Sequence, residues 1–180
     1  MDKSRLEKLL LSIDEEASLS LGSTEEKPRV VIAGGSAFML HDVTRRPATH
    51  DVDILSADER IRALLERYPE VNGAISAFCD PIPYNFEDRL VPIPLDTTAV
   101  VFLIPSLEDL AVMKLYAWRP NDQADLTSPL FLERIDWKLL DHLVYSPDEA
   151  QASSLVPRRY REMIATYEQY REEYFRESDV

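Results

Sequence analysis

The sequence has little of several residue types, and each shortage excludes a class of protein. Cys79 is the only cysteine, so a disulfide framework and a thiolate metal site are both excluded. No apolar run approaches the roughly 20 residues that a membrane-spanning helix needs. The charged, periodic stretch that begins at Met1 is also unlike a secretory signal peptide. We therefore expect a cytoplasmic protein that does not enter the membrane.

Basic residues are scarce as well. The chain has 20 lysines and arginines against 33 aspartates and glutamates, which gives a net charge of −13. Such a charge disfavours nonspecific attraction to DNA, RNA or an anionic membrane. A nucleic-acid substrate would therefore need a local basic rim, and we expect no DNA partner. A basic protein partner is compatible with this charge.

The length and the order of the elements favour one compact α/β (α+β) fold. A chain of 180 residues that is 45% apolar can bury one core and is too short for two. Hydrophobic patterning predicts strands at 29–33, 51–55, 74–78 and 99–104, with a less distinct one at 84–91. It predicts helices at 4–16, 36–41, 56–67, 106–118, 134–145 and 158–176. Ser4 with Glu7, and Ser56 with Glu59, predict capping boxes. The layout indicates a small mixed sheet flanked by helices, with a core over 1–126 and a helical extension over 127–180 packed on it.

An aromatic-rich stripe follows one side of the last predicted helix. It is more typical of a docking face, toward the domain or a second subunit, than of a base-stacking platform. Its members are Tyr160, Met163, Ile164, Tyr167, Tyr170 and Tyr174.

A glycine turn follows the first predicted strand. Two of the four glycines are Gly34 and Gly35, with Ser36 directly behind them. Such a turn at the start of a helix offers backbone N–H groups to an anion. It equally suits a tight connection that needs positive φ or close packing. The dinucleotide fingerprint and the Walker loop are both excluded, because the third glycine and the Gly-Lys-Ser/Thr signature are missing.

Two carboxylates, Asp51 and Asp53, stand at alternate positions of the next predicted strand. Side chains at such positions share one face of the strand, and their Cα atoms lie about 7 Å apart. This separation lets them hold one Mg²⁺ or bridge two ions, although an acidic strand end exposed to water has the same pattern. Phosphate and divalent metal occur together in phosphoryl transfer, so the turn and the acidic pair suggest one site.

The order of these parts resembles the DNA polymerase beta-like nucleotidyltransferase superfamily. The pattern runs from a strand through Gly-Gly-Ser and a short helix to an arginine-bearing loop, then to Thr49-His50-Asp51-Val52-Asp53. The resemblance implies a nucleotidyltransferase fold in which Gly34, Gly35 and Ser36 hold the triphosphate of an NTP. It also implies that Asp51 and Asp53 bind Mg²⁺ or Mn²⁺.

A second segment looks like the AbiEii-type branch, which contains toxin nucleotidyltransferases of toxin–antitoxin systems. The segment is Val101–Leu110, then Lys114-Leu115-Tyr116-Ala117, then Asp122 and Asp125-Leu126. The resemblance implies that Lys114 contacts the nucleotide phosphates and that Asp122 completes the site. Asp122 would orient Lys114 or act as a base, or it is simply a helix cap. The alternative interpretation of Lys114 is a solvated lysine on an amphipathic helix.

Other charged residues complete the predicted site. Arg46, with Arg45 and Arg119, is a candidate to meet the triphosphate or a tRNA end, or is surface charge. Members of the superfamily often carry a third metal-binding carboxylate. The candidate here is Asp88, with Glu87 and Asp96 as alternatives.

The resemblance implies transfer of a nucleoside monophosphate from an NTP to an acceptor hydroxyl, on an RNA or tRNA end or on a protein. It also implies a possible antitoxin partner. A catalytically weak or inactive nucleotide-binding or interaction module on the same fold is the alternative. A transferase that modifies a sugar or an antibiotic is a third hypothesis.

Overall fold

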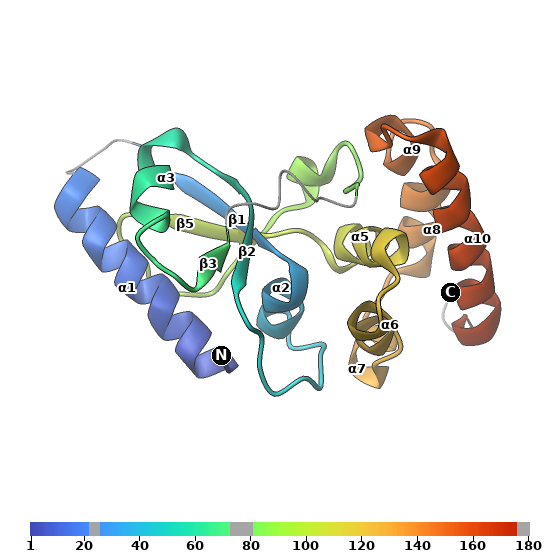
Figure 1. Cartoon of the computed structure of the whole chain (residues 1–180), viewed down its shortest axis with the longest axis horizontal. Coiled ribbons are helices and arrows are strands. Elements are labelled where there is room, and N and C mark those ends of the chain that lie inside the picture. The colour runs from blue at the N-terminus through green and yellow to red at the C-terminus, as the bar shows by residue number, and fades with distance from the viewer. Residues whose placement is uncertain (22–25, 73–80, 176–180) are drawn as a thin grey trace. The chain divides into compact units, whose positions relative to one another are not determined.

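The computed structural model describes residues 1–21, 26–72 and 81–175 (Figure 1). The chain divides into two compact units. The first unit comprises Met1–His41, Arg46–Phe78 and Leu90–Pro105, and the second comprises Asp42–Arg45, Cys79–Arg89 and Ser106–Val180. None of the helices in the described residues is both long and apolar enough to cross a bilayer.

A mixed sheet forms the centre of the first unit. Its described strands lie in the order β3-β2-β1-β5-β4, where β1 is Arg29–Ala33, β2 Val52–Ala57, β3 Val71–Asn72, β4 Val91–Pro92 and β5 Val101–Ile104. Strand β1 pairs antiparallel with β2 and parallel with β5. The central β1 is buried from Val30 to Ala33, as its run of β-branched residues predicts.

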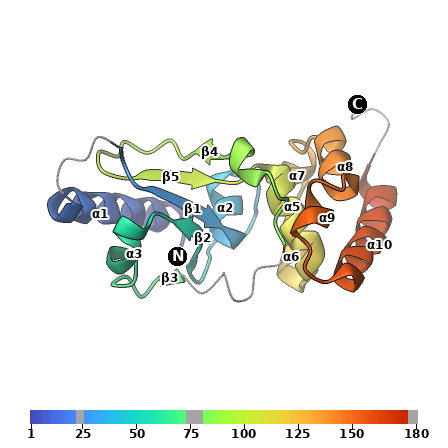
Figure 2. The ribbon, with the colours of Figure 1, turned by 90° about the horizontal axis from the view of Figure 1, so that it is seen from above.

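Three helices accompany this sheet. They are α1 (Lys3–Leu21), α2 (Gly34–Leu40) and α3 (Glu59–Leu65). Helix α1 lies against α2 and α3, and α2 packs beside β1 and β2 (Figures 1 and 2). The inner face of α1 buries Leu6, Leu10 and Ile13, in agreement with the predicted amphipathic pattern.

The second unit is helical in the residues described. It contains the 3₁₀ helix η1 (Phe86–Arg89), α5 (Leu107–Ala117), α6 (Pro120–Leu126), α7 (Pro129–Leu132), α8 (Trp137–Tyr145), α9 (Ala150–Ser153) and α10 (Pro157–Tyr174). Helix α5 is buried almost all round and packs against α8 and α10. The α/β class with a mixed sheet and a helical C-terminal part is thus confirmed. Helices α5 and α6 group here with the C-terminal helices, while the predicted division at residue 126 stays a prediction.

The buried aromatic stripe of α10 docks within the second unit. Tyr167 donates its hydroxyl hydrogen to Asp141 Oδ1 (2.7 Å), and Tyr170 donates to the carbonyl oxygen of Leu126 (2.7 Å). The ring of Tyr170 also packs against those of Trp118 and Trp137. The predicted docking face is therefore occupied by the chain's own helices.

Several predicted boundaries are wrong. Residues 84–91 form η1 and the start of β4 instead of one strand. Neither predicted capping box starts its helix: Asp2 Oδ1 accepts the N–H of Arg5 at α1, and Asp58 caps α3. Ser56 lies inside β2, which continues to Ala57. The predicted strand at 74–78 lies outside the described residues.

Candidate active site

Gly34 lies where β1 ends and α2 begins, and its backbone requires glycine. Its φ is +62°, in the left-handed region that side chains disfavour. A Cβ atom built on Gly34 would lie 2.1 Å from Oδ2 of Asp53, well inside van der Waals contact. The missing side chain therefore lets the Asp53 carboxylate lie directly against the turn.

Strand pairing explains why Asp53 meets this turn. In the antiparallel pair of β1 and β2, Asp53 stands opposite Ala33, the residue before Gly34. On its other side, Asp53 pairs in register with Asn72 of β3, whose Nδ2 donates to Asp53 Oδ1 (3.3 Å). Val52 and Ile54 point into the core, as the predicted alternation requires. The Asp53 side chain is thus held at the sheet end that carries the glycine turn.

Asp51 lies one residue before β2, so the predicted strand begins one residue too early. Its carbonyl oxygen accepts hydrogen bonds from the hydroxyls of Ser36 (2.8 Å) and Thr49 (3.0 Å). Ser36 is fully buried, so its hydroxyl fixes the backbone at Asp51 to the start of α2. A phosphate contact by Ser36 stays a prediction. Because its hydroxyl already donates to Asp51, Ser36 would make this contact through its backbone N–H.

Arg46 lies beside the second glycine of the turn. A Cβ on Gly35 would lie 2.8 Å from Nη2 of Arg46 and 3.4 Å from its guanidinium carbon. The loop between α2 and β2 carries both Arg46 and Asp51. A carboxylate therefore lies beside Gly34 and a guanidinium lies beside Gly35. A carboxylate suits a metal cation, and a guanidinium suits a phosphate anion.

Lys114 and Asp122 meet in the second unit, in a buried cluster of charged side chains. The Lys114 ammonium lies 3.0 Å from Asp122 Oδ1 and 2.8 Å from Asp125 Oδ2, and its residue is only 6% exposed. The interpretation of Lys114 as a solvated lysine is therefore wrong. The sequence motif included Asp125 without a role for it, although a spacing of three residues on one helix places it beside Asp122.

The two aspartates of this cluster also have other partners. Arg119 donates to Asp122 Oδ2 from Nε (2.7 Å) and from its backbone N–H (3.2 Å), and Thr44 donates its hydroxyl to Asp125 Oδ1 (2.8 Å). Burial raises the pKa of Asp122, but the hydrogen bond from Arg119 and the charge of Lys114 outweigh burial and lower it overall. Asp122 is thus held as a carboxylate. It accepts the backbone N–H of Arg119 at the start of α6, and it also pairs with Lys114.

The third carboxylate is the least supported part of the predicted site. Asp88 is exposed in η1, and its neighbour Arg89 is the residue engaged there, with Asp109 (2.8 Å) and Glu149 (3.1 Å). Within residues 1–21, 26–72 and 81–175, no three histidines, cysteines or acids gather in a way that could hold a metal ion. Metal binding by Asp51, Asp53 and Asp88 therefore stays a prediction.

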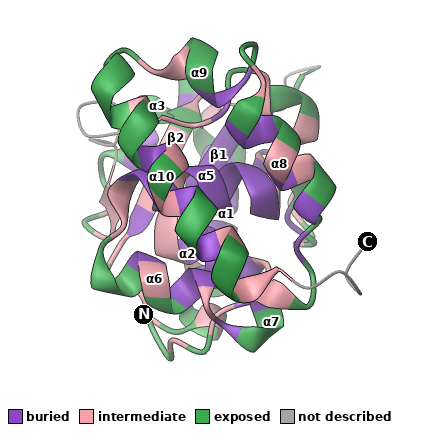
Figure 3. Cartoon of the chain, turned by 90° about the vertical axis from the view of Figure 1, so that its right-hand side faces the viewer, coloured by how far each residue is buried: buried purple, intermediate pink, exposed green. Residues whose placement is uncertain are grey.

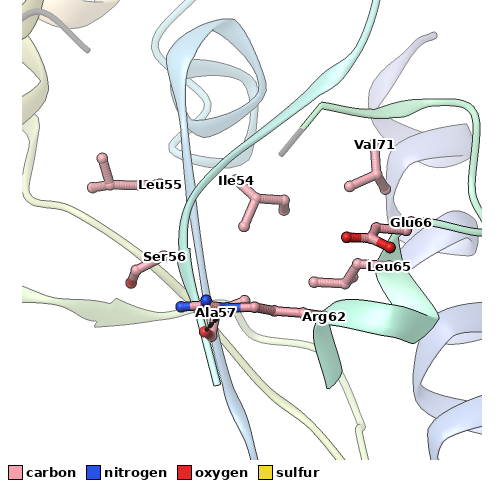
Figure 4. Close-up of a pocket in the computed structure, with 8 residues that line it drawn as sticks. All are labelled: Ile54, Leu55, Ser56, Ala57, Arg62, Leu65, Glu66 and Val71. Atoms are coloured by element: carbon pink, nitrogen blue, oxygen red, sulfur yellow. Dashed lines mark hydrogen bonds between the residues drawn. The ribbon is translucent and has the colours of Figure 1, made fainter. Parts of the chain in front are cut away.

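A separate pocket of about 550 Å³ lies in the first unit, beside the second half of β2 (Figure 4). Arg62 closes one side, and its Nε donates to the carbonyl oxygen of Ala57 (3.1 Å). None of the predicted site residues lines this pocket, whose walls are Ile54, Leu55, Ser56, Ala57, Arg62, Leu65, Glu66 and Val71.

Comparison with known proteins agrees with the class that the turn and the acidic pair indicate. Residues 8–175 match the family described as "Nucleotidyltransferase of unknown function (DUF6036)", and the chain belongs to this family. No curated protein and no solved structure matches the chain. The predicted nucleotidyltransferase family is thereby confirmed, whereas the AbiEii-type branch stays a prediction.

Proposed function

We propose that this protein transfers a nucleoside monophosphate from an NTP to an acceptor hydroxyl, with release of pyrophosphate. Asp51 and Asp53 would hold Mg²⁺ or Mn²⁺, with phosphate oxygens and water as the remaining ligands. The bound ion would supply charge neutralisation of the triphosphate. The turn at Gly34 and Gly35 would bind phosphate oxygens through its backbone N–H groups, assisted by Arg46.

The observation that carries this proposal is the contact between Asp53 and Gly34. A carboxylate held against a bare Cα at a strand-to-helix turn brings a metal ligand next to the start of a helix, where the first N–H groups have no partner within the helix. Both carboxylate and phosphate oxygens are hard donors that suit Mg²⁺. The family description supports the same reaction class.

Lys114 and Asp122 enter the proposal as positioning residues. An ammonium that already contacts two carboxylates has little charge left for a phosphate group. We propose that this cluster fixes the segment from Trp118 to Asp125 within the second unit, and that Arg46, whose guanidinium lies against Gly35, is the phosphate-binding cation of the glycine turn. The acceptor that we favour is an RNA end such as that of tRNA, with a protein hydroxyl as the alternative.

A second candidate function is nucleotide binding without transfer. In the described residues the Asp53 carboxylate lies against the turn, and no three potential metal ligands gather. This candidate function needs fewer metal ligands than transfer does. Such a protein would act through a partner, such as an antitoxin, and would keep the affinity for the metal–NTP complex.

The proposal is tested by two measurements on the same samples. Each labelled NTP is incubated with the protein, Mg²⁺ or Mn²⁺ and total tRNA, and the melting temperature is recorded with and without the metal–NTP complex. We expect label transfer to RNA and a metal-dependent rise in melting temperature. A rise without transfer to RNA or protein supports the binding module, and the absence of both effects rejects the nucleotide site.

Matched variants separate the site from the rest of the surface. Asp51→Asn and Asp53→Asn are each expected to lower transfer at least about 100-fold and to remove the metal-dependent stabilisation. Glu59→Gln removes one exposed acidic charge from α3 and is expected to keep both. Equal activity of all three variants would reject the assigned metal ligands.

A further inference from the structure

Helix α10 carries an exposed face that the second unit does not use. Met163, Tyr167 and Tyr170 are buried on its inner side. In Figure 3, which looks onto α10, exposed residues recur along its outer turns. Arg158, Arg161, Ala165, Glu168 and Glu172 are all exposed. Their spacing of three and four residues in alternation places them in one seam along the helix, which we call the α10 seam.

Charge is segregated along the α10 seam. Its N-terminal half carries Arg158 and Arg161, with the exposed Arg159 and Glu162 beside them, and its C-terminal half carries Glu168 and Glu172. The centre is Ala165, the smallest side chain of the seam. The basic half stands out in a chain whose net charge is −13.

This polarity opposes the helix dipole at both ends. The N-terminus of a helix is stabilised by acidic residues and the C-terminus by basic ones. The first turn of α10 has no acidic residue, and Glu172 lies in the last turn. Arg158 does pair with Glu162 (2.8 Å), but an arginine that precedes its glutamate is the weaker orientation. Arg171, the base in the last turn, is turned toward Asp141.

We propose that the α10 seam binds the same seam of a second copy of this chain, with the two helices antiparallel. A two-fold axis at Ala165 would place each basic half against an acidic half, so that every charge of the seam meets its opposite. The antiparallel arrangement also aligns the two helix dipoles favourably. The small side chain at the crossing point permits close approach of the helices. This interface is independent of the proposed nucleotide site.

Area and charge predict how such a dimer behaves. A helix of 18 residues is about 27 Å long, so one helix pair buries less surface than a permanent dimer needs. Exposed ion pairs are screened by salt. We therefore expect a weak dimer that forms at low ionic strength and dissociates as salt is added.

A charge-swap experiment on the full chain tests the proposal. Arg158→Glu with Arg161→Glu makes the seam wholly acidic, and Glu168→Arg with Glu172→Arg makes it wholly basic. Sedimentation velocity over a concentration series at low salt should show dimerisation of the wild type, weakened roughly tenfold or more in either variant alone. An equimolar mixture of the two variants should dimerise again, because each basic seam then faces an acidic one.

The control is the double variant Lys8→Glu with Lys138→Glu, which reverses two exposed charges in α1 and α8. It should dimerise as the wild type does. The thermal melting of the acidic-seam variant should not fall, because glutamates suit a helix N-terminus. A wild type that stays monomeric, or variants whose mixture does not associate, would overturn the proposal. Loss of tRNA retention by the acidic-seam variant, with its mass unchanged from a monomeric wild type, would instead assign the arginines to RNA.

Discussion

The candidate site depends on the absence of side chains at Gly34 and Gly35, which leaves room for neighbouring charged groups. At Gly34 a side chain would meet a carboxylate that the pairing of β2 with β1 and β3 holds in place. At Gly35 the atoms nearest to an added side chain would be those at the far end of the flexible Arg46 side chain. The two adjacent glycines therefore have different physical requirements, and substitution by alanine distinguishes them.

We predict that Gly34→Ala lowers the free energy of unfolding by about 1–3 kcal/mol, because it combines a positive φ with a clash. Chemical denaturation measures this loss. Gly35→Ala should cost clearly less, since Arg46 can move aside. It should instead weaken the binding of the metal–NTP complex that we propose. Equal losses of stability in the two variants would contradict this assignment.

The buried Lys114 leads to a second prediction about stability. Lys114→Met leaves Asp122 and Asp125 buried without their ammonium partner, a change that costs about 3–5 kcal/mol for buried pairs. Urea denaturation of this variant measures the loss, with the exposed Lys138→Met as the control. A loss below about 1 kcal/mol would show that Lys114 is not needed to balance these carboxylates.

Among the elements, those with a strong local pattern were predicted well. The run Val30-Val31-Ile32 predicted the observed bounds of β1. The helix predicted over 106–118 is observed as α5, which Ser106 caps by accepting the N–H of Asp109. The predicted caps at Ser4 and Ser56 are wrong because a nearby aspartate takes the capping position instead. Asp2 does so in α1 and Asp58 in α3. Both residues cap as well as serine does, so local sequence does not decide between them.

Contacts between distant segments could not be predicted from the sequence. The glycine turn and the acidic pair were recognised because their order is a local pattern. The salt bridges of Arg89 to Asp109 and Glu149 join three segments that only the fold brings together. Asn72 reaches Asp53 through strand register, which depends on how β3 pairs. For the same reason the pattern of acids left three alternatives, Asp88, Glu87 and Asp96, for a third carboxylate.

Asp14 shows how one such contact fixes a whole element. This buried residue of α1 accepts four hydrogen bonds at the start of β5: from the N–H and hydroxyl of Thr98, and from the N–H groups of Ala99 and Val100. We predict that Asp14→Asn lowers the free energy of unfolding by about 2–3 kcal/mol, since the amide puts a donor among donors. Its exposed neighbour provides the control, and Glu15→Gln should change the stability by less than about 0.5 kcal/mol. A small effect at Asp14 would mean that α1 is held by packing alone.

On the scale of the whole molecule, the excess of acids sets how stability responds to pH. Burial raises the pKa of Asp14, Asp122 and Glu149, but hydrogen bonds from their partners lower each of them overall. A carboxylate with a lowered pKa in the folded state stabilises the fold above its ordinary pKa and loses this contribution as the pH falls. Glu108 behaves in the opposite way, because burial raises its pKa.

These opposing effects predict a maximum of stability at mildly acidic pH. Between pH 8 and about 5 the net charge of −13 shrinks, and the self-repulsion of the folded chain falls with it. Below the ordinary values of 3.8 for aspartate and 4.5 for glutamate, the unfolded chain takes up protons at Asp14, Asp122 and Glu149 that the folded chain, with its lowered pKa values, does not yet take up. The three resulting losses of stability outweigh the gain at Glu108. We expect the free energy of unfolding in urea to peak near pH 5–6 and to fall by at least about 2 kcal/mol toward pH 3.

Asp14→Asn should show a shallower fall on the acid side than wild type or Glu15→Gln, because one titrating group is gone. A stability that keeps rising to pH 3, or an equal slope in all three proteins, would show that these carboxylates do not govern the acid unfolding.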